Sequence, residues 1–366
     1  MKFTVAKGII LEELQLLQGI VEKRNTMPIL ANILLSAGEG RVDLTGTDLE
    51  VGMKTFFAAD VQETGAVTVS GKKIYEIVKS LPEGQDVSFR ESGDHIIEVV
   101  SGESEFRVVC LPKEEYPAVP EPKFEKNIMI PVGDFQEMID RVFFAIAQEQ
   151  RYYLNGALLV VKPKSLELIS TDGHRLSYTG RNVDGLGVSK EVRVIVAKKT
   201  LGELRKFGDG MIEFDLDENN LFFRCGARTV ISRIIESKFP NFDAVIPKDN
   251  PYHLVLPKDS FLDAIRRVAL FSAERSKGIK FTLEKNRLRL FSSNPEIGEA
   301  RDKLDVEYKG AAVEIGFNSQ YIIDFLTTVP TEKVKFELKD ENSAAMLKPE
   351  GEAGLTNLYV LMPMKI

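Results

Sequence analysis

One helical pattern recurs three times along the chain, at intervals of roughly 125 residues, which is far longer than the period of solenoid repeats. The first copy begins near Ala6. In every copy, apolar residues recur four and then three positions apart, which is typical of one face of an amphipathic helix. We expect N-caps at Asp134 and at Asp259 or Ser260 in the later copies. The aligned apolar positions are Ile10, Phe135 and Phe261, then Leu14, Ile139 and Ile265, then Leu17, Val142 and Val268.

A second helical pattern follows in each copy, from Gly71, Ala197 and Ser319. Strands that end in polar turns lie between the two helices, and alternating strand patterns follow the second helix. These landmarks predict three similar α+β domains, each with two helices packed on antiparallel sheets. Linkers rich in proline and charge place the boundaries, and the predicted domains are residues 1–120, 128–250 and 251–366.

The composition is that of an ordinary globular protein, with 43% hydrophobic and 28% charged residues among 366. The N-terminus lacks the pattern of a signal peptide, and no apolar run is long enough to span a bilayer. We interpret Cys110 and Cys225 as reduced core residues, because a zinc site needs more Cys or His ligands. The sequence therefore predicts a cytoplasmic protein with no metal site.

A net charge of −7 at first argues against a nucleic-acid partner, but a phosphate backbone responds to the distribution of charge. The predicted helices are rich in lysine and arginine, at positions that recur between the repeats. We predict that basic residues of the second helices contact DNA, although such residues often only solvate a helix. The predicted contacts are Lys72, Lys73, Lys198, Lys199 and Arg205, and Lys7 and Arg141 belong to the same outward-facing set on the first helices.

Domain size limits how such a chain could surround DNA. A domain of about 120 residues is a ball roughly 35 Å across. Three touching balls leave a hole too narrow for a duplex, whereas six leave a hole about one ball wide. A head-to-tail dimer could therefore encircle DNA, and a monomer could not.

Ten ordered landmarks resemble the bacterial DNA polymerase III beta subunit, the sliding-clamp family, along the whole chain. They are TMPILANILL, LTGTDLE, SLPEG, CLPKEEYP, RYYLNGALL, STDGHRL, SKFPNF, SSNPE, EIGFNSQYIIDFL and YVLMPMKI. The resemblance implies a homodimeric ring that encircles double-stranded DNA without reading its sequence. It implies a clamp loader, DNA polymerase III alpha subunit, other polymerases and repair proteins as partners. It implies no cofactor and no catalytic activity.

The resemblance also implies a pocket for short hydrophobic peptides between the second and third domains. Leu, Val, Pro and Met suit such a groove because they adapt to aromatic and aliphatic anchors. Ala244, where relatives often have arginine, and the stretch 344–346 depart from the family pattern. The matching positions are Leu154, Thr171, Gly173, His174, Arg175, Leu176, Pro240, Val245, Val360, Met362, Pro363 and Met364.

Two further sets of residues come from the resemblance. Arg24 matches a duplex-contacting position of the family, and Gln148 or Glu149 lies near a second one. Phe106 and Val108 match an edge strand of the first domain at the dimer interface, and Leu270 and Phe271 match a helix of the third domain.

Two other functions stay open at the level of residues. An enzyme of nucleic-acid metabolism is disfavoured, because the chain has three histidines, His95, His174 and His253, and no phosphate-binding loop or nucleophile motif. Carboxylates are plentiful, however, so a carboxylate site is not excluded by counting. A protein-only scaffold with solvated helices is the second alternative.

Overall fold

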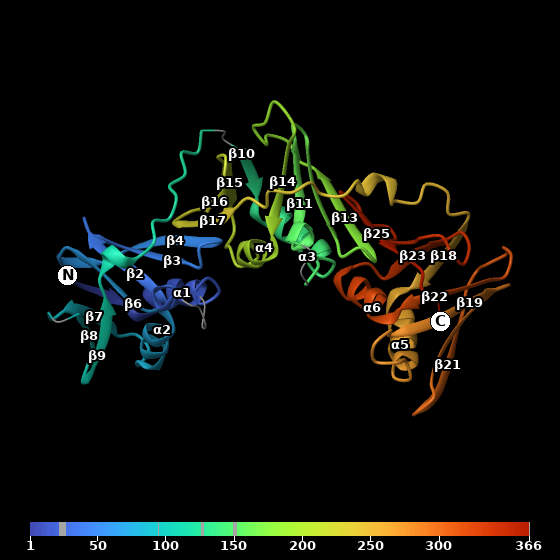
Figure 1. Cartoon of the computed structure of the whole chain (residues 1–366), viewed down its shortest axis with the longest axis horizontal. Helices are drawn as coiled ribbons and strands as arrows, with labels where there is room; N and C mark the ends of the chain where they lie inside the picture. The colour runs from blue at the N-terminus through green and yellow to red at the C-terminus, as the bar shows by residue number, and fades with distance from the viewer. Residues whose placement is uncertain (22–26, 94, 126–127, 149–151, 366) are drawn as a thin grey trace. The chain divides into compact units, whose positions relative to one another are not determined.

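We analysed a computed structural model, which describes residues 1–21, 27–93, 95–125, 128–148 and 152–365. Contacts between residues divide the chain into two compact units (Figure 1). Unit 1 comprises Met1–Gly133 and Lys199–Ile234, and unit 2 comprises Asp134–Lys198 and Ile235–Ile366. In the described residues, one order of elements recurs three times: a strand, a helix, further strands, a second helix and three strands. The predicted α+β class and the threefold repeat are confirmed.

The first repeat lies in unit 1. Its helices are α1 (Lys7–Leu17) and α2 (Gly71–Ser80), with 3-10 turns η1 (Pro28–Ala31) and η2 (Lys113–Glu115). Its strands are β1 (Lys2–Ala6), β2 (Asn32–Gly38), β3 (Arg41–Thr47), β4 (Val51–Ala58), β5 (Asp60–Glu63), β6 (Gly65–Ser70), β7 (Asp86–Glu91), β8 (Ile96–Ser101) and β9 (Ser104–Leu111).

The second repeat is divided between the units. Its helices are α3 (Val132–Phe143) and α4 (Lys198–Leu204), with 3-10 turns η3 (Tyr152–Leu154) and η4 (Phe242–Ala244). Its strands are β10 (Ile128–Pro131), β11 (Gly156–Lys162), β12 (Ser165–Thr171), β13 (Arg175–Asn182), β14 (Val192–Ala197), β15 (Met211–Leu216), β16 (Asn220–Cys225) and β17 (Arg228–Arg233).

The third repeat lies in unit 2. Its helices are α5 (Lys258–Ala269) and α6 (Ser319–Thr328). Its strands are β18 (Tyr252–Pro257), β19 (Gly278–Glu284), β20 (Arg287–Asn294), β21 (Gly298–Asp305), β22 (Val313–Asn318), β23 (Lys333–Leu338), β24 (Ala345–Pro349) and β25 (Leu355–Leu361).

The helix starts correct one prediction. α3 begins at Val132 and α5 begins at Lys258, so Asp134, Asp259 and Ser260 lie inside the first turn rather than at the N-cap. At α5 the N-cap position is occupied by Pro257, whose side chain has no acceptor for the first backbone N–H groups of the helix. The two carboxylates still favour the positive end of the helix dipole.

Each unit contains a sheet that continues from one repeat into another. In unit 1, thirteen described strands run in the order β10-β15-β16-β17-β4-β3-β2-β6-β9-β8-β7-β1-β5. In unit 2, eight run β14-β11-β12-β13-β25-β24-β23-β18, and a separate sheet of four runs β21-β20-β19-β22. The antiparallel pairs β4–β17 and β13–β25 are the two places where repeats share a sheet.

The aligned apolar stripes form the core, as the repeat predicts. Phe261 of α5 packs with Phe281, Phe317 and Phe336 in a fully buried aromatic group. Burial of apolar side chains, including this aromatic group, is the main stabilising contribution to the fold.

Two basic residues expected to point outward are instead buried. Lys7 Nζ donates to the Leu81 carbonyl at 2.6 Å and pairs with Glu83. Arg141 pairs with Glu352 at 2.7 Å and donates to the Thr328 carbonyl. Both cations replace water with internal partners, so the prediction was wrong for them.

The cysteines agree only in part with their predicted role. Both thiols are free, and burial raises the pKa of Cys110 to about 11, which keeps it protonated. Cys225 is only half-buried, at the end of β16, so it is not a core residue.

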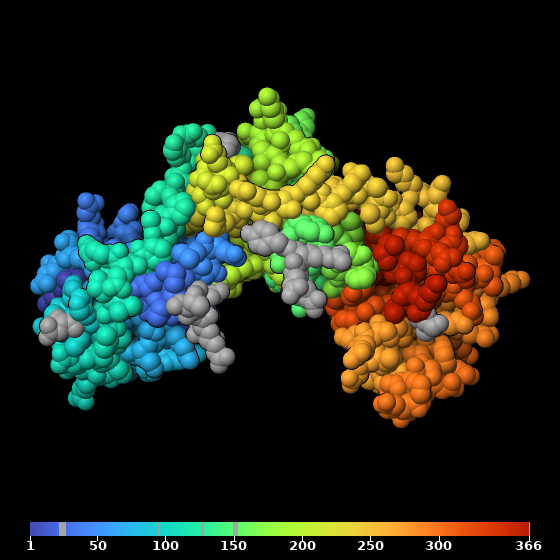
Figure 2. Space-filling model, in the orientation of Figure 1, coloured from blue at the N-terminus to red at the C-terminus, as the bar shows by residue number. Residues whose placement is uncertain are grey.

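Four strands lie at margins of the two units. β7, β8 and β9 lie side by side at one margin of unit 1, and β21 runs along a margin of unit 2 (Figure 1). In the space-filling view, the orange residues of the third repeat form that margin of unit 2 (Figure 2).

Candidate functional site

The turn between β12 and β13 is built by its own side chains. Asp172 Oδ1 accepts hydrogen bonds from the backbone N–H groups of His174 and Arg175, at 2.9 and 3.1 Å. The Thr171 hydroxyl donates to the Arg175 carbonyl at 2.6 Å. Gly173 has φ of 92°, a region that glycine occupies without steric cost. The string TDGHR therefore specifies a rigid turn with an exposed tip.

The C-terminal segment runs beside this turn. β25 pairs with β13, with Leu361 opposite Arg175 and Val360 opposite Leu176. The Met362 N–H donates to the His174 carbonyl at 3.0 Å. The structure thus brings together predicted pocket residues that are far apart in the sequence.

An apolar floor lies beneath this junction, and an exposed rim surrounds it. Leu176 and Val360 belong to one buried cluster with Phe242, among others. Met362 and Val245 keep 44% and 41% of their surface exposed, which leaves apolar area available to a ligand. Of the other predicted residues, Leu154 and Thr171 are buried, Pro363 and Met364 are half-buried, and Gly173, His174 and Pro240 are exposed.

The two departures from the family pattern lie at this cluster. Ala244 is exposed at the end of η4, where its side chain is only a methyl group. Ala344 packs against the buried cluster, and its carbonyl accepts from Asn250 Nδ2 at 3.1 Å. Ala345 and Met346 are buried in β24. Within this stretch Ala344 supports the floor, and Ala345 belongs to the core of the third repeat.

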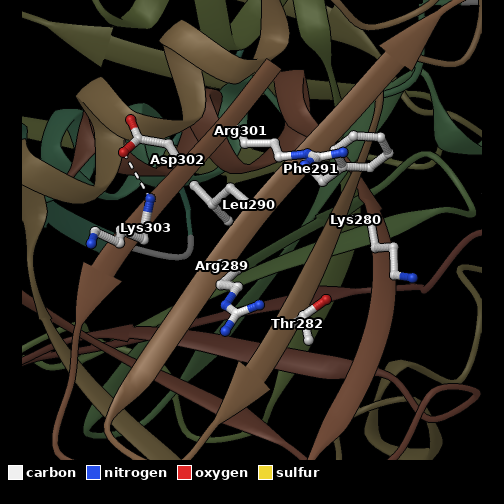
Figure 3. Close-up of a pocket in the computed structure, with 8 residues that line it drawn as sticks. All are labelled: Lys280, Thr282, Arg289, Leu290, Phe291, Arg301, Asp302 and Lys303. Atoms are coloured by element: carbon white, nitrogen blue, oxygen red, sulfur yellow. Dashed lines mark hydrogen bonds between the residues drawn. The ribbon is translucent and has the colours of Figure 1, made fainter. Parts of the chain in front are cut away.

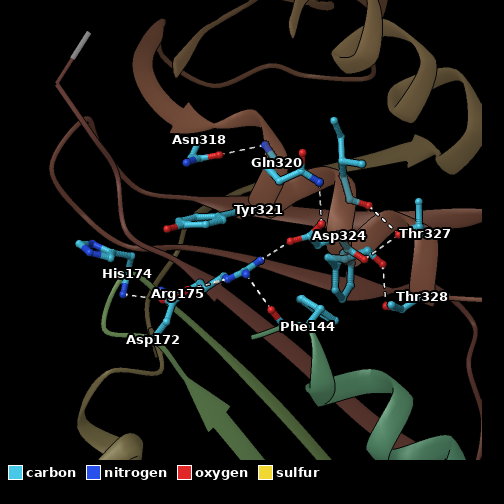
Figure 4. A network of polar contacts seen from close by, with 12 residues as sticks. Phe144, Asp172, His174, Arg175, Asn318, Gln320, Tyr321, Asp324, Thr327 and Thr328 are labelled. Carbon is cyan, nitrogen blue, oxygen red and sulfur yellow. Dashed lines mark hydrogen bonds and ion pairs between the residues drawn. The ribbon is translucent and has the colours of Figure 1, made fainter. Parts of the chain in front are cut away.

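Arg175 is the centre of a polar network beside this floor (Figure 4). Its Nη1 donates to Asp324 of α6 at 2.6 Å, its Nε to Asp172 at 2.9 Å, and its Nη2 to the Phe144 carbonyl at 2.7 Å. The guanidinium carbon lies 4.2 Å from the ring centroid of Tyr321. Arg175 was predicted only as a pocket residue, and the structure makes it a link between two repeats.

The electrostatics keep Arg175 charged. Burial by itself lowers its pKa, but Tyr359 and Asp324 outweigh that effect and raise the pKa above the ordinary value. Sequence reasoning missed Tyr321, Asp324 and Tyr359, because no local pattern connects these residues with the STDGHRL turn.

The residues predicted to contact DNA fall into two groups. Lys72, Lys73, Arg205 and Gln148 are exposed. Lys72 and Lys73 lie in the first turn of α2, each within ion-pair distance of Glu76, at 3.7 and 3.0 Å.

The second group is engaged internally. Lys199 Nζ donates to the Asp48 carboxylate and, at 2.8 Å, to the Ile20 carbonyl. Lys198 Nζ lies 5.2 Å from the Phe143 ring centroid, and burial, followed by the charge of Arg175, lowers its pKa. Arg24 lies outside the described residues.

The predicted interface residues lie at the two margins. Phe106 and Val108 are on β9, half-buried and buried respectively. Leu270, directly after α5, is 74% exposed, and Phe271 is half-buried. Leu270 and Phe271 thus present apolar side chains at the end of α5.

A groove that the sequence did not reveal lies on the outer face of the third repeat (Figure 3). Its volume is about 590 Å³, and four of its lining residues are cationic. The lining residues are Lys280, Thr282, Arg289, Leu290, Phe291, Arg301, Asp302 and Lys303.

The described residues contain neither a cluster of metal ligands nor a helix that could cross a membrane. No group of three or more His, Cys, Asp or Glu side chains in them could hold a metal ion. No helix in the same residues has the length and apolarity to cross a membrane.

Comparison with known families gives one match for each third of the chain. The N-terminal domain of the DNA polymerase III beta subunit matches residues 1–120, its central domain matches 129–241, and its C-terminal domain matches 243–365.

Individual relatives agree over their full length. The beta sliding clamp of Escherichia coli K12 is 34% identical over 371 residues, and that of Pseudomonas aeruginosa is 35% identical over 371, with 100% of each chain covered. A crystal structure of the P. aeruginosa clamp bound to griselimycin superposes with a TM-score of 0.94 at 34% identity, and the Caulobacter crescentus clamp with 0.92 at 33%, again with 100% of each chain covered. The chain therefore belongs to the DNA polymerase III beta subunit family, the beta sliding clamps.

Proposed function

We propose that this protein is a processivity factor, which encircles duplex DNA and tethers a DNA polymerase through the apolar surface beside the β12–β13 turn. The observation that carries the proposal is the junction of β13 with β25. There a buried apolar floor at Leu176 and Val360 meets the exposed side chain of Met362. Such a floor with an adaptable rim suits the hydrophobic anchors of a short peptide.

The ring is a head-to-tail dimer of this chain. Each protomer has three domains, bounded as 1–120, 128–250 and 251–366. A dimer therefore has six domains, which surround a hole roughly 35 Å wide. The family matches to three consecutive segments support these boundaries. Exposed Leu270 and the β9 and β21 margins supply apolar area and strand edges for closure.

Contact with DNA in this ring is electrostatic and independent of sequence. Lysine and arginine that face phosphates give weak, salt-sensitive attraction, which permits sliding. We assign the contacts first to exposed Lys72, Lys73, Arg205 and Gln148, and then to Lys198 and Lys199, which have internal partners. Arg24 is proposed as a DNA contact on the basis of the family resemblance alone.

The clamp holds DNA by topology rather than by affinity. It therefore needs no catalytic group, and we assign it a non-catalytic role in the cytoplasm. A clamp loader, DNA polymerase III alpha subunit, other polymerases and repair proteins are its proposed partners. Arg175 forms ion pairs with both Asp172 and Asp324, and these contacts suit a structural role for the three charges.

Retention on circular DNA tests the proposal. The protein is loaded onto nicked circular DNA with a clamp loader and ATP, and the circle is then linearised in moderate salt. We expect the protein to stay on the circle and to leave the linear form through its free ends. Equal retention on both forms would show ordinary affinity and would exclude a ring.

The same experiment separates the alternatives. A protein-only scaffold would not be retained on either form. An enzyme of nucleic-acid metabolism would convert the DNA in a metal-dependent reaction, which gel analysis of the recovered circle would reveal.

A further inference from the structure

Two joints inside the chain have the same construction. In unit 1, β4 pairs antiparallel with β17, and Gly52 lies opposite Ile231. In unit 2, β13 pairs antiparallel with β25, and Leu176 lies opposite Val360. In each joint, the strand that follows the polar turn of one repeat pairs with the last strand of the next repeat.

Both kinds of strand also occur with an open edge. Among the described residues, β21 pairs only with β20. β9 pairs with β6 only at Cys110 and Leu111, so residues 104–109 have β8 as their single described neighbour. An open edge presents a row of N–H and C=O groups to another strand. In the proposed dimeric ring, these two edges would form a third joint of the same kind, between β21 of one copy and β9 of the other.

The repeat fixes the position of β21 in such a joint. Ser170 and Ser292 are equivalent, because each hydroxyl donates to the carbonyl of an aligned valine in the first helix of its repeat, at 2.6 and 2.5 Å. β13 pairs with the strand that holds Ser170, and β21 pairs with the strand that holds Ser292. In these pairings, Glu299 of β21 occupies the position that Leu176 occupies in β13.

The hairpins fix the position of β9 in the same way. Cys225 lies opposite Arg228 where the β16–β17 hairpin turns, and Ser101 lies opposite Ser104 where the β8–β9 hairpin turns. Arg107 of β9 therefore takes the place of Ile231 of β17.

The resulting register is complementary in charge and in size. On the helix-facing side, small residues oppose large ones, with Ala300 opposite Phe106 and Gly298 opposite Val108. On the outward side, six exposed residues form three pairs of opposite charge. They are Glu299 with Arg107, Arg301 with Glu105, and Lys303 with Glu103.

Slipped registers lose most of this complementarity and keep one pair of opposite charge, Lys303 with Glu105 or Arg301 with Glu103. A shift of two residues, which keeps the same faces inward, places Arg301 opposite Arg107 in one direction and Glu299 opposite Glu105 in the other. Each shift therefore creates a contact between like charges. Like charges directly opposite each other destabilise a strand pairing, so these contacts discriminate against the slipped registers.

The groove on β19–β21 holds the guanidinium of Arg301 in a fixed position on the sheet (Figure 3). The Arg301 guanidinium lies over the Phe291 ring, 5.4 Å from its centroid, and 3.0 Å from Glu299. A guanidinium that is already held against the sheet loses little side-chain freedom when it pairs across the seam.

We propose that these alternating charges fix the register of the seam and restrict β21 to β9 of a second copy of this chain. The inference rests on the proposed dimeric ring, and it adds which residues meet and why a clamp with other charges is rejected.

Charge reversal tests the register in the full-length protein. Glu105→Lys alone places Lys opposite Arg301 at both seams of a homodimer, and Arg301→Glu alone places Glu opposite Glu105. We expect each variant to raise the dimer dissociation constant at least about tenfold. A mixture of the two variants restores opposite charges at both seams, so native mass spectrometry should find the heterodimer well above its statistical share. Lys285→Glu, an exposed reversal in the β19–β20 turn, is the control and should leave the dimer unchanged.

The outcomes separate the two proposals. A wild-type protein that stays monomeric at high concentration overturns the ring itself. A stable wild-type dimer with weakened single variants and no excess of heterodimer overturns the register and leaves the ring standing. Single variants that dimerise like wild type, with intact folding by circular dichroism, show that these charges do not select the partner.

Discussion

The guanidinium of Arg175, at the start of β13, donates to the carboxylate of Asp324 on α6 across 2.6 Å. This pair ties the polar turn of the middle repeat to the second helix of the third repeat. In unit 1, the corresponding contact joins Asp48 of the first turn to Lys199 of α4. The two joints thus use ion pairs of opposite polarity, so the contact is retained while the residue types are exchanged.

Removing Arg175 should loosen the joint within unit 2. We expect Arg175→Ala to lower the free energy of unfolding by about 3 kcal/mol, because two half-buried carboxylates, Asp172 and Asp324, lose their shared cation. Arg175→Lys should recover only part of this loss, since an ammonium cannot make the forked contacts of a guanidinium. Urea unfolding measures the difference. Combining Arg175→Ala with Asp324→Asn should give a coupling energy of about 1 kcal/mol or more, and simple additivity would contradict the role of the pair.

Met362 should contribute to peptide binding with little effect on stability. Its side chain is 44% exposed over the apolar floor. We expect Met362→Ala to weaken a hydrophobic clamp-binding peptide by about 1–2 kcal/mol, or roughly tenfold, because an anchor loses a packing partner. Met211→Ala is the matched control, since Met211 is 43% exposed on β15 of unit 1. Fluorescence anisotropy with a labelled peptide measures both, and equal affinities would place the groove elsewhere.

Periodicity was sufficient to predict the elements of the fold. The apolar stripe at Phe261, Ile265 and Val268 marks α5, and all three residues are buried. The alternation in VKFELKD predicts β23 in the same way. These patterns are local, because each helix or strand exposes one face and buries the other.

The candidate site was predictable only through the family resemblance. Arg175 and Asp324 are separated by 149 positions, and neither has a neighbour whose type reveals the other. Lys199 has the outward pattern of a solvated lysine, yet it serves a joint whose partner, Asp48, lies in the preceding repeat. Pairing between repeats depends on strand register, which a single sequence specifies weakly when the partner strand is distant.

Acidification should weaken the β18–β23–β24 part of unit 2 through Glu337. Burial raises the pKa of this carboxyl, but hydrogen bonds from Lys348 and Lys335 outweigh burial and lower it below the ordinary value of 4.5. A lowered folded-state pKa contributes stability that is present above pH 4.5 and is lost as pH falls through the folded-state value. We expect Glu337→Gln to be less stable than wild type at neutral pH by roughly 1–3 kcal/mol and to lose less stability on acidification. Parallel urea midpoints above and below pH 4.5 would contradict this assignment.

Lys72 and Lys73 should separate DNA contact from dimer closure. Both are exposed and lie near Glu76, so each alanine variant removes the same local ion pair. Lys73 aligns with Lys199, whose side chain contacts the polar turn of the preceding repeat. In the proposed ring, the turn in the equivalent position is the one at Asn294 of a second copy. We therefore expect Lys73→Ala to raise the dimer dissociation constant by about threefold or more. Lys72→Ala should leave the dimer unchanged and reduce the salt dependence of duplex binding by about one phosphate contact. Sedimentation and anisotropy across a salt series measure the two effects, and a Lys73→Ala variant that alters only the salt dependence would limit Lys73 to its proposed DNA contact and exclude a role in dimer closure.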